Sequence, residues 1–402
     1  MARFAFFSTC PEPWGGSEEL WAGTAAALAE SGHSVAVFKT CVDRCHPRIL
    51  RLLALGCRIR DLHQACLPSR VQLPKSLVQL TRRTISQRAV VPFLRRHLAK
   101  LKTDLVVVSQ GGNFDGLVYS DLCRTSGRPY VIVSQKATDH IWPSDPERAV
   151  MRSVFQAAQK CFFVSQHNLR LTERQIGETL TNAATVRNPF LVSSETSSPW
   201  PSRQDDTMRL ACVARLCIAD KGQDILLQVL AREKWRNRKL SVSFFGAGRN
   251  REGLRELAAR LGLKNISFPG FVNDIESVWR SHHALVLASR TEGLPLSLIE
   301  AMMSGRFGIV TNEGGNSEVI EDGRTGFLAG APKVDEFDDA MERAWAARDD
   351  WESIGKAAGT AVRTIVPPDP VARFACKLLE LVDPLNPQRA AVPVPALQNA
   401  LP

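Results

Sequence analysis

The chain has 402 residues, of which 44% are apolar and 23% charged, and a formal net charge of +10. This length exceeds what one hydrophobic core usually serves, so we expect two domains of a globular protein. Because no run of eighteen or more apolar residues occurs and the start leads into a strand pattern without a cleavage site, we expect a cytoplasmic protein without a membrane span.

The first half of the chain alternates short apolar runs with segments of helical length. Residues 3–9 predict a buried strand that the Pro- and Gly-containing segment 11–16 ends, and residues 17–19 can cap the helix that follows. Such alternation is typical of a parallel sheet covered by helices on both faces. Further strands are expected at residues 35–38, 105–108, 130–133 and 161–164.

The composition changes to Pro, Ser, Glu and Thr between residues 189 and 206, which predicts a linker. The alternation then resumes, so a second α/β domain is expected after the linker. Its predicted strands lie at residues 209–214, 241–245, 266–268, 284–287 and 307–310, and its closing helices near residues 335–347 and 351–364.

These patterns predict an α/β protein with two Rossmann-like domains, residues 1–188 and 207–366. Residues 367–382 predict a C-terminal helix that could pack back on the first domain, and the Pro- and Ala-rich residues 383–402 predict a disordered tail. The two domains are expected to face each other across a cleft at the carboxyl ends of their strands, where doubly wound sheets bind ligands.

The ten cysteines are scattered along a long chain and several lie inside apolar runs, so we expect reduced core residues rather than disulfides. One group of cysteines and histidines could suggest zinc. Its spacing does not match the common paired-ligand patterns, and no Asp-x-Asp pair stands out in a suitable loop, so we expect neither a metal site nor a cofactor. The group consists of Cys41, Cys45, His46, Cys57, His63 and Cys66.

Positive charge is concentrated between residues 62 and 103, where nine Lys or Arg residues occur without an acid. Such a stretch could attract an anionic membrane surface, nucleic acid or a phosphorylated substrate, with nucleic acid the least favoured partner. Apolar residues interleave with the basic ones between residues 90 and 102, a pattern compatible with a helix lying on a membrane. A basic helix docked on its own domain would have the same pattern.

The segment with the clearest chemistry is residues 289–302. It follows a predicted buried strand, crosses a Gly-containing loop and enters a helix whose first turn is expected to hold Pro295. Free amides at a helix start, together with the helix dipole, form an anion site suited to a diphosphate. Two carboxylates flank this site, Glu292 in the loop and Glu300 within the helix.

These two glutamates, separated by seven residues, resemble the signature of glycosyltransferase family 4, whose members have the GT-B fold. Flanking segments also resemble family motifs, and the likeness extends over most of the chain. They are Arg215-Leu216 with Lys221-Gly222, Gly246-Ala247-Gly248, Gly270-Phe271-Val272, Gly314-Gly315 with Glu318 and Ile320, and, near the start, Gly15-Gly16-Ser17-Glu18 and Gly32-His33-Ser34-Val35.

The resemblance implies a retaining, metal-independent transferase that moves a sugar from a nucleoside diphosphate, UDP favoured over GDP, to an acceptor hydroxyl in glycan, glycolipid or glycoside biosynthesis. It implies that Arg215 and Lys221 hold the diphosphate, that Glu300 accepts hydrogen bonds from the ribose diol, and that Glu292 approaches the transferred sugar. Further donor contacts are implied for Gly15, Gly16, Gly246, Val272, Gly293, Leu294, Pro295 and Leu296.

One family feature is absent, the histidine that usually follows the strand at residues 130–133. Gln135 and His140 are the two candidates to replace it as a sugar contact. The missing histidine motivates a second hypothesis, a catalytically silent GT-B protein that binds nucleotide sugar. The sequence is also compatible with an epimerase or hydrolase on the same scaffold, and with a basic protein that binds a membrane surface or nucleic acid.

Overall fold

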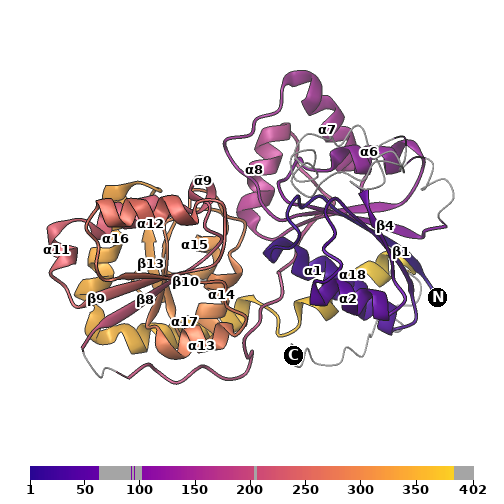
Figure 1. Ribbon diagram of the computed structural model, residues 1–402. Helices are drawn as coiled ribbons and strands as arrows, with labels where there is room; N and C mark the ends of the chain where they lie inside the picture. Colours follow the sequence, from indigo (N-terminus) through magenta and orange to yellow (C-terminus); the bar gives the residue numbers. More distant parts are fainter. Residues whose placement is uncertain (63–91, 93–94, 96–101, 203–205, 384–402) are drawn as a thin grey trace. The chain divides into compact units, whose positions relative to one another are not determined.

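The computed structural model describes residues 1–62, 92, 95, 102–202 and 206–383. The chain forms two compact units (Figure 1), of which one comprises Met1–Pro189 with Asp369–Pro402 and the other Phe190–Pro368. The prediction of two Rossmann-like α/β domains is confirmed, because each unit is built on one parallel sheet. Most of the basic stretch and the predicted C-terminal tail lie outside the described residues.

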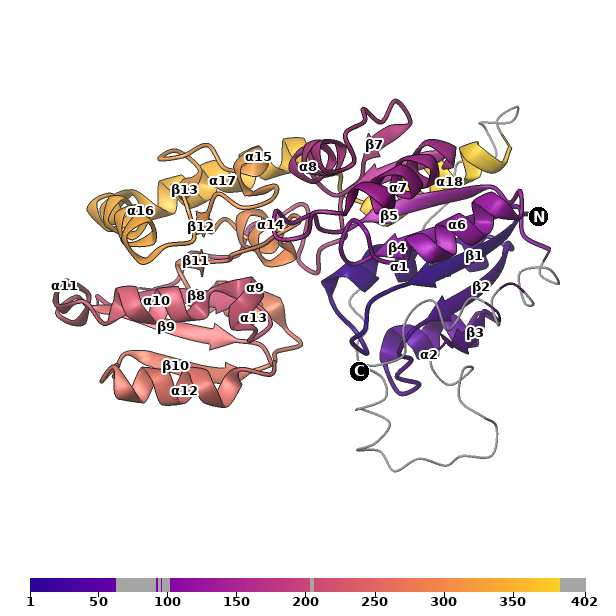
Figure 2. The same ribbon diagram turned by 90° about the horizontal axis from the view of Figure 1, so that it is seen from above.

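The first unit contains a seven-stranded sheet in the order β3-β2-β1-β4-β5-β6-β7, and every neighbouring pair is parallel. Helices cover both of its faces, α1, α2 and α18 on one and α6, α7 and α8 on the other (Figures 1 and 2). The strands are β1 (Arg3–Ser8), β2 (Ser34–Lys39), β3 (Arg58–Asp61), β4 (Leu105–Gln110), β5 (Tyr130–Ser134), β6 (Lys160–Phe163) and β7 (Ala183–Thr185). The helices are η1 (Gly16–Glu18), α1 (Glu19–Glu30), α2 (Pro47–Ala54), α6 (Leu117–Thr125), α7 (Asp145–Ala157), α8 (Gln166–Ile176) and α18 (Pro370–Val382).

Local sequence explains where several of these helices begin and end. Ser144 and Glu147 form a capping box at the start of α7, and the Ser165 hydroxyl accepts a hydrogen bond from the Asn168 amide at the start of α8. Helix α8 ends at Gly177, which takes the left-handed conformation that glycine adopts at little cost. The central strands of the sheet are buried on both faces, which accounts for their continuous apolar runs.

The second unit contains a six-stranded parallel sheet in the order β10-β9-β8-β11-β12-β13. Helices α12 and α16 lie on one face, and α13, α14 and α17 on the other (Figure 1). Helix α10 packs against α12 and α16. The strands are β8 (Met208–Val213), β9 (Leu240–Phe245), β10 (Ile266–Gly270), β11 (Ala284–Leu287), β12 (Phe307–Thr311) and β13 (Gly326–Ala329). The helices are α9 (Ile218–Lys221), α10 (Gln223–Leu230), α11 (Glu233–Arg236), α12 (Arg251–Arg260), α13 (Ile275–Ser281), α14 (Leu296–Met303), α15 (Asn316–Val319), α16 (Val334–Ala346), η2 (Arg348–Asp350) and α17 (Trp351–Ile365).

The last described helix, α18, belongs to the first unit and packs against α1. The two helices approach closely at Gly23, where a Cβ atom would lie 2.8 Å from Val371 Cγ2. Phe374 packs edge-on against Phe162 of β6, and Lys377 Nζ donates a hydrogen bond to the Thr185 carbonyl of β7. Glycine at position 23 is therefore what lets α18 lie against α1.

The segment expected to be a linker packs on the second unit over residues 190–202. Ser198 N donates a hydrogen bond to Ser304 O, and the Trp200 ring lies edge-on to His283. The guanidinium of Arg306 is buried and donates to the carbonyls of Ser198 and Pro199. This part of the chain is a surface strap of the second unit rather than a free spacer.

Candidate functional site

The loop between β11 and α14 carries the first of the two predicted glutamates. Strand β11 ends at Leu287, and α14 begins at Leu296, with Pro295 as its N-cap at φ −62° and ψ 127°. Pro295 thus lies one residue before the helix rather than in its first turn, although its carbonyl accepts hydrogen bonds from Leu298 and Ile299. The first amides of α14 point out of the helix end, as at any helix N-terminus, and can bind an anion.

Glu292 and Lys221 form an ion pair between this loop and the end of α9. Lys221 Nζ lies 2.6 Å from Glu292 Oε1, and the two side chains are 17% and 5% exposed. Helix α9 can approach the loop because Gly222 has φ +57° and no Cβ, which would lie 1.9 Å from the Ala288 carbonyl oxygen. Two predicted catalytic residues 71 positions apart are therefore in direct contact.

Arg215 follows β8 and is linked to the same loop through Asp220. Its guanidinium lies 3.3 Å from Asp220 Oδ2, and its side chain is half exposed. The Asp220 carbonyl accepts hydrogen bonds from the amides of Arg290 and Thr291, at 2.8 and 3.1 Å. Asp220 therefore holds both the arginine and the backbone that leads to Glu292, a role that the sequence analysis missed although Asp220 directly precedes Lys221.

Glu300 lies on α14 and is 6% exposed, so it is not an ordinary helix-surface glutamate. Its Oε1 atom accepts a hydrogen bond from the Leu191 amide at 3.1 Å. Leu191 belongs to the strap that the sequence analysis treated as a linker, so no sequence signal connected the two residues. The contact joins α14 to the start of the strap.

The glycine-rich loop before α15 packs against the backbone next to Glu292. Gly315 N donates a hydrogen bond of 2.6 Å to Gly293 O. Gly314 has φ +59°, and a Cβ there would lie 2.4 Å from the Glu292 carbonyl oxygen. The predicted Gly-Gly motif is therefore a close backbone contact that fixes the Glu292–Gly293 peptide.

Gly246 and Gly248 make the turn after β9 against the segment that carries Arg215. Gly246 has φ +126°, its amide donates to Gly270 O, and a Cβ would lie 2.1 Å from Ala214 O. A Cβ at Gly248 would lie 2.4 Å from Leu216 O. Close backbone packing on both sides of Arg215 accounts for both glycines. Val272 follows β10 and is half-buried.

The remaining predicted residues belong to the first unit. Gly15 is extended, at φ −168°, and Gly16 opens η1, so both lie between β1 and α1. Gln135 follows β5, is buried, and its Oε1 accepts a hydrogen bond from Asn188 Nδ2 at 2.7 Å. His140 is exposed on the next loop, where its amide donates to Thr138 Oγ1. Of these two candidates for the missing histidine, Gln135 alone is buried at the carboxyl end of a strand.

The cysteines of the described residues are free thiols. Burial raises the pKa of Cys57 to about 11 and that of Cys212 to about 12, so both stay protonated at neutral pH. No group of three or more His, Cys, Asp or Glu residues that could hold a metal was found in the part of the chain that the structure describes. His63 and Cys66 of the predicted cluster lie outside that part.

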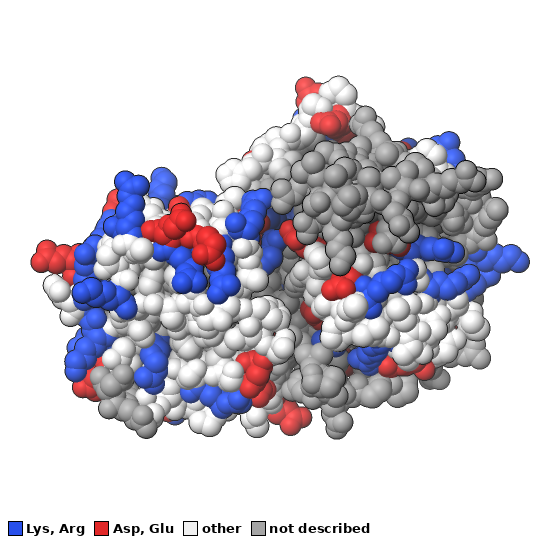
Figure 3. Space-filling model, in the orientation of Figure 1, with Lys and Arg blue, Asp and Glu red and all other residues white. Residues whose placement is uncertain are grey.

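Charges of both signs are interspersed on the face of the second unit that Figure 3 shows. Several charged side chains of the second unit are paired, for example Lys234 with Asp338 and Arg343 with Asp322. Such pairing leaves much of the positive charge of this unit locally balanced. No helix within the described ranges is both long enough and apolar enough to span a bilayer.

Comparison with protein families gives a match within the second unit. Residues 207–347 match the family model described as "Glycosyl transferases group 1". This segment contains the second-unit site residues described above, except those of the strap. The match to the group 1 model therefore covers the β8–α16 part of the chain.

Individual relatives match over part of their length. The chain is 32% identical to the putative glycosyltransferase EpsD of Bacillus subtilis over 127 residues, which are 31% of this chain and 33% of EpsD. It is 25% identical to the GDP-mannose-dependent alpha-(1-6)-phosphatidylinositol monomannoside mannosyltransferase of Mycolicibacterium smegmatis over 242 residues, 55% of this chain and 62% of that protein. The aligned part thus spans less than two thirds of either relative.

Solved structures match both units. HepE of Anabaena, determined in complex with UDP, has a TM-score of 0.72 at 17% identity, covering 94% of this chain and 99% of HepE. Sucrose-phosphate synthase of Thermosynechococcus elongatus has a TM-score of 0.71 at 15% identity, covering 96% of this chain and 99% of that one. At such identities the likeness shows the fold, which is that of GT-B glycosyltransferases.

Proposed function

We propose that this chain, whose residues 207–347 match the group 1 glycosyl transferases, is a retaining glycosyltransferase of family 4. It transfers a sugar from a nucleoside diphosphate, with UDP favoured over GDP, to an acceptor hydroxyl in glycan, glycolipid or glycoside biosynthesis. The observation that carries the proposal is the contact between Lys221 and Glu292 beside the start of α14, within the matched segment. HepE, which shares the fold, binds UDP, UDP-glucose, and UDP together with glucose.

The proposed chemistry is electrostatic. Lys221, Arg215 and the first amides of α14 neutralise the charge that grows on the diphosphate as its bond to the sugar breaks. Fixed cations fill the place of a metal, so we propose that the transfer needs neither metal nor cofactor. Glu292 is bound to Lys221 before the donor arrives. When the Lys221 ammonium binds phosphate instead, the Glu292 carboxylate becomes available to hydroxyls of the transferred sugar.

The proposal includes further donor contacts in each of the two units. Glu300 binds the ribose diol through its carboxylate, because an ionised carboxylate accepts hydrogen bonds and so matches two vicinal hydroxyls. In the first unit, the Gly15–Gly16 backbone binds the diphosphate and Gln135 supplies the sugar contact of the missing histidine. Gln135 is favoured over His140 because it is buried at a strand end whereas His140 is exposed. The remaining proposed contacts are Gly246, Val272, Gly293, Leu294, Pro295 and Leu296.

Binding and turnover test this function together. Thermal unfolding and calorimetry with UDP, GDP, ADP and their sugars should identify one donor that raises the unfolding temperature, because a ligand that binds only the native state stabilises it. Incubation with that donor and candidate acceptors in chelator, followed by nuclear magnetic resonance of the product, should show a glycoside with the donor's anomeric configuration. An inverted product would refute retention, and absence of binding to every nucleotide would refute the function.

A catalytically silent GT-B protein is the second candidate, favoured by Gln135 at the place of the family's histidine. This candidate predicts tight donor binding without transfer or hydrolysis.

A cytoplasmic location, with peripheral contact to an anionic membrane through residues 62–103, is part of our proposal. Sedimentation with anionic and neutral vesicles tests the membrane contact.

A further inference from the structure

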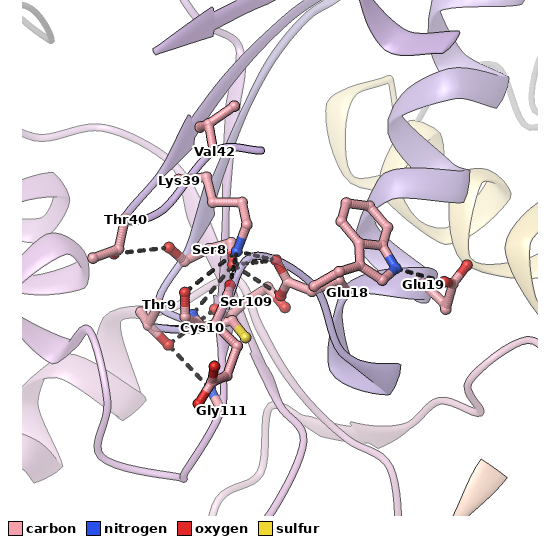
Figure 4. Close-up of polar contacts among 12 residues, drawn as sticks. Ser8, Thr9, Cys10, Glu18, Glu19, Lys39, Thr40, Val42, Ser109 and Gly111 are labelled. Atoms are coloured by element: carbon pink, nitrogen blue, oxygen red, sulfur yellow. Dashed lines mark hydrogen bonds and ion pairs between the residues drawn. The ribbon is translucent and has the colours of Figure 1, made fainter. Parts of the chain in front are cut away.

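Lys39 is a fully buried lysine at the carboxyl end of β2. Its ammonium lies 2.7 Å from Glu18 Oε2, and the two side chains are 0% and 1% exposed. The same ammonium donates hydrogen bonds to the carbonyls of Cys10, at 3.3 Å, and Glu12, at 3.0 Å. Figure 4 shows these contacts converging on one nitrogen atom. An ammonium has three N–H donors, so Lys39 uses all of them.

The carboxylate of the pair has a second partner besides the ammonium. The Ser8 hydroxyl at the end of β1 lies 2.9 Å from both Glu18 oxygens. Charges are removed from water only at a large cost, which is offset when geometry and hydrogen bonds are complete. A packed apolar pair at these positions would often be as stable, so stability alone does not explain the ion pair.

The partners of Lys39 enclose the loop between β1 and α1. Cys10 and Glu12 precede Gly15 and Gly16, and Glu18 follows them, so one ammonium holds this loop on both sides of the glycines. Glu18 N also donates to Gly15 O at 2.9 Å. A separate contact, from Trp14 Nε1 to Glu19 Oε1 at 2.7 Å, fixes the middle of the loop.

We infer that Lys39 is a positioning residue that holds the Gly15–Gly16 backbone in the conformation that binds the donor diphosphate. This inference rests on the proposed function, in which those glycines meet the phosphates. The Lys39 contacts to Cys10 and Glu12 go to carbonyls outside any helix or strand. They set the path of an irregular loop before ligand arrives, and a preorganised loop binds more tightly because less ordering is needed on binding.

Two substitutions separate positioning from stability. Lys39→Met leaves Glu18 as a buried unpaired charge and is expected to lower the unfolding temperature. The double variant Glu18→Gln/Lys39→Met removes both charges and should recover much of that stability, but it still lacks the ammonium that holds Cys10 and Glu12. Lys39→Arg keeps a charged donor and should retain part of the donor affinity. If Lys39→Met does not fold, the donor affinities of Lys39→Arg and the double variant are compared instead.

Calorimetry with UDP and UMP is the measurement, alongside thermal unfolding. We expect the double variant to bind UDP about tenfold or more weakly than wild type, equivalent to about 1.4 kcal/mol. The affinity for UMP should fall less than the affinity for UDP, because UMP lacks the second phosphate. Asn182→Ala is the control, since Asn182 binds the carbonyls of Phe155 and Ala158 in the same unit, away from the loop. It should lower the unfolding temperature and leave UDP affinity unchanged.

The outcomes distinguish the inference from the function on which it rests. If wild type binds UDP and the double variant binds it equally well, the inference is wrong and the function stands. The inference is also wrong if UDP affinity follows unfolding temperature across all variants, Asn182→Ala included. If wild-type protein binds no UDP, GDP or ADP, the proposed function fails and the inference fails with it.

Discussion

Lys221 Nζ lies 2.6 Å from Glu292 Oε1, so the cation proposed to bind diphosphate already has a carboxylate partner in the protein. The pair joins α9 to the loop before α14. The donor diphosphate must therefore compete with the Glu292 carboxylate for the Lys221 ammonium. The loop must keep its conformation when the ammonium changes partner. The backbone at Gly222 and at Gly314 packs closely against this loop, at the carbonyls of Ala288 and Glu292.

Replacement of Lys221 by Met is expected to reduce sugar transfer by about 10² to 10³ in kcat, the usual effect of removing one group that stabilises developing charge. Steady-state kinetics with the identified donor measure this. Lys239→Ala is the matched control, because Lys239 is 71% exposed and 3.9 Å from Asp206, a pair that contributes little. Equal loss in both variants would argue against a specific role of Lys221.

Glu300→Gln is expected to weaken binding of UDP by about 10- to 100-fold, because hydrogen bonds to charged groups contribute about 1.5–3 kcal/mol. A glutamine oxygen can still accept from the Leu191 amide, so the fold contact should survive. Calorimetry should show a smaller loss for 2′-deoxy-UDP, which lacks one hydroxyl of the diol. Glu256→Gln, on the exposed face of α12, is the control and should bind both nucleotides as wild type does. Equal losses for both nucleotides in Glu300→Gln would contradict the ribose role.

Gly314→Ala is expected to destabilise the second unit by about 3 kcal/mol, from overpacking and left-handed strain combined. The new Cβ would lie 2.4 Å from Glu292 O and 2.7 Å from Gly293 O. Gly323→Ala is a matched control, since Gly323 has φ +78° with nothing within 4 Å of its Cβ position, and strain alone should cost about 1–2 kcal/mol. Urea unfolding measures both, and a smaller loss at Gly314 than at Gly323 would be the contrary result.

Arg306 is expected to be a major stabilising residue of the strap. Burial lowers its pKa to about 10, yet it remains charged at neutral pH and donates to the carbonyls of Trp279, His282 and Pro199. Arg306→Met leaves the buried carbonyls of Trp279 and His282 unpaired, which should cost about 3 kcal/mol or more. Thermal unfolding and limited proteolysis of residues 190–202 measure the effect. Arg324→Met, 72% exposed, should be nearly neutral, and an equally small effect at Arg306 would contradict the strap.

Stability in acid should depend on Asp338. Burial by itself would raise the pKa of this carboxyl, but hydrogen bonds from Lys234 and Trp235 and the charges of Lys234 and Arg232 outweigh it, so the pKa lies below its ordinary value. A lowered folded-state pKa stabilises the fold above the unfolded pKa of about 4, and this contribution disappears as pH falls through the folded value.

Asp338→Asn should therefore be less stable than wild type at pH 7, and the difference should shrink below about pH 4. Thermal unfolding between pH 3 and pH 7 measures it. Asp335→Asn is the comparison, because Asp335 contacts the same Arg232 but is exposed and should contribute little. A difference between Asp338→Asn and wild type that stayed constant with pH would contradict the assignment.

Three strands were not predicted from apolar runs in the sequence, and all three lie at the edge of a sheet. They are β3, β7 and β13. The sequence of β3, Arg58–Asp61, alternates exposed and buried residues, and β7 has three half-buried ones. Strands β3 and β7 are buried less than the central strands, so their sequences have a weaker apolar signal. Strand β13 is largely buried, but it has only four residues and begins at a glycine. The central strands were predicted to within one or two residues.

The sequence by itself determined the alternation of strands and helices and the strand–loop–helix that carries Glu292 and Glu300, because apolar period, caps and glycine turns are local properties. Only the tertiary structure decided that Lys221 meets Glu292, that Leu191 binds Glu300, that α1 is the helix against which α18 packs and that Lys39 is buried against Glu18. Each of these joins distant residues, and such contacts depend on how whole elements pack rather than on the residues beside them in the chain.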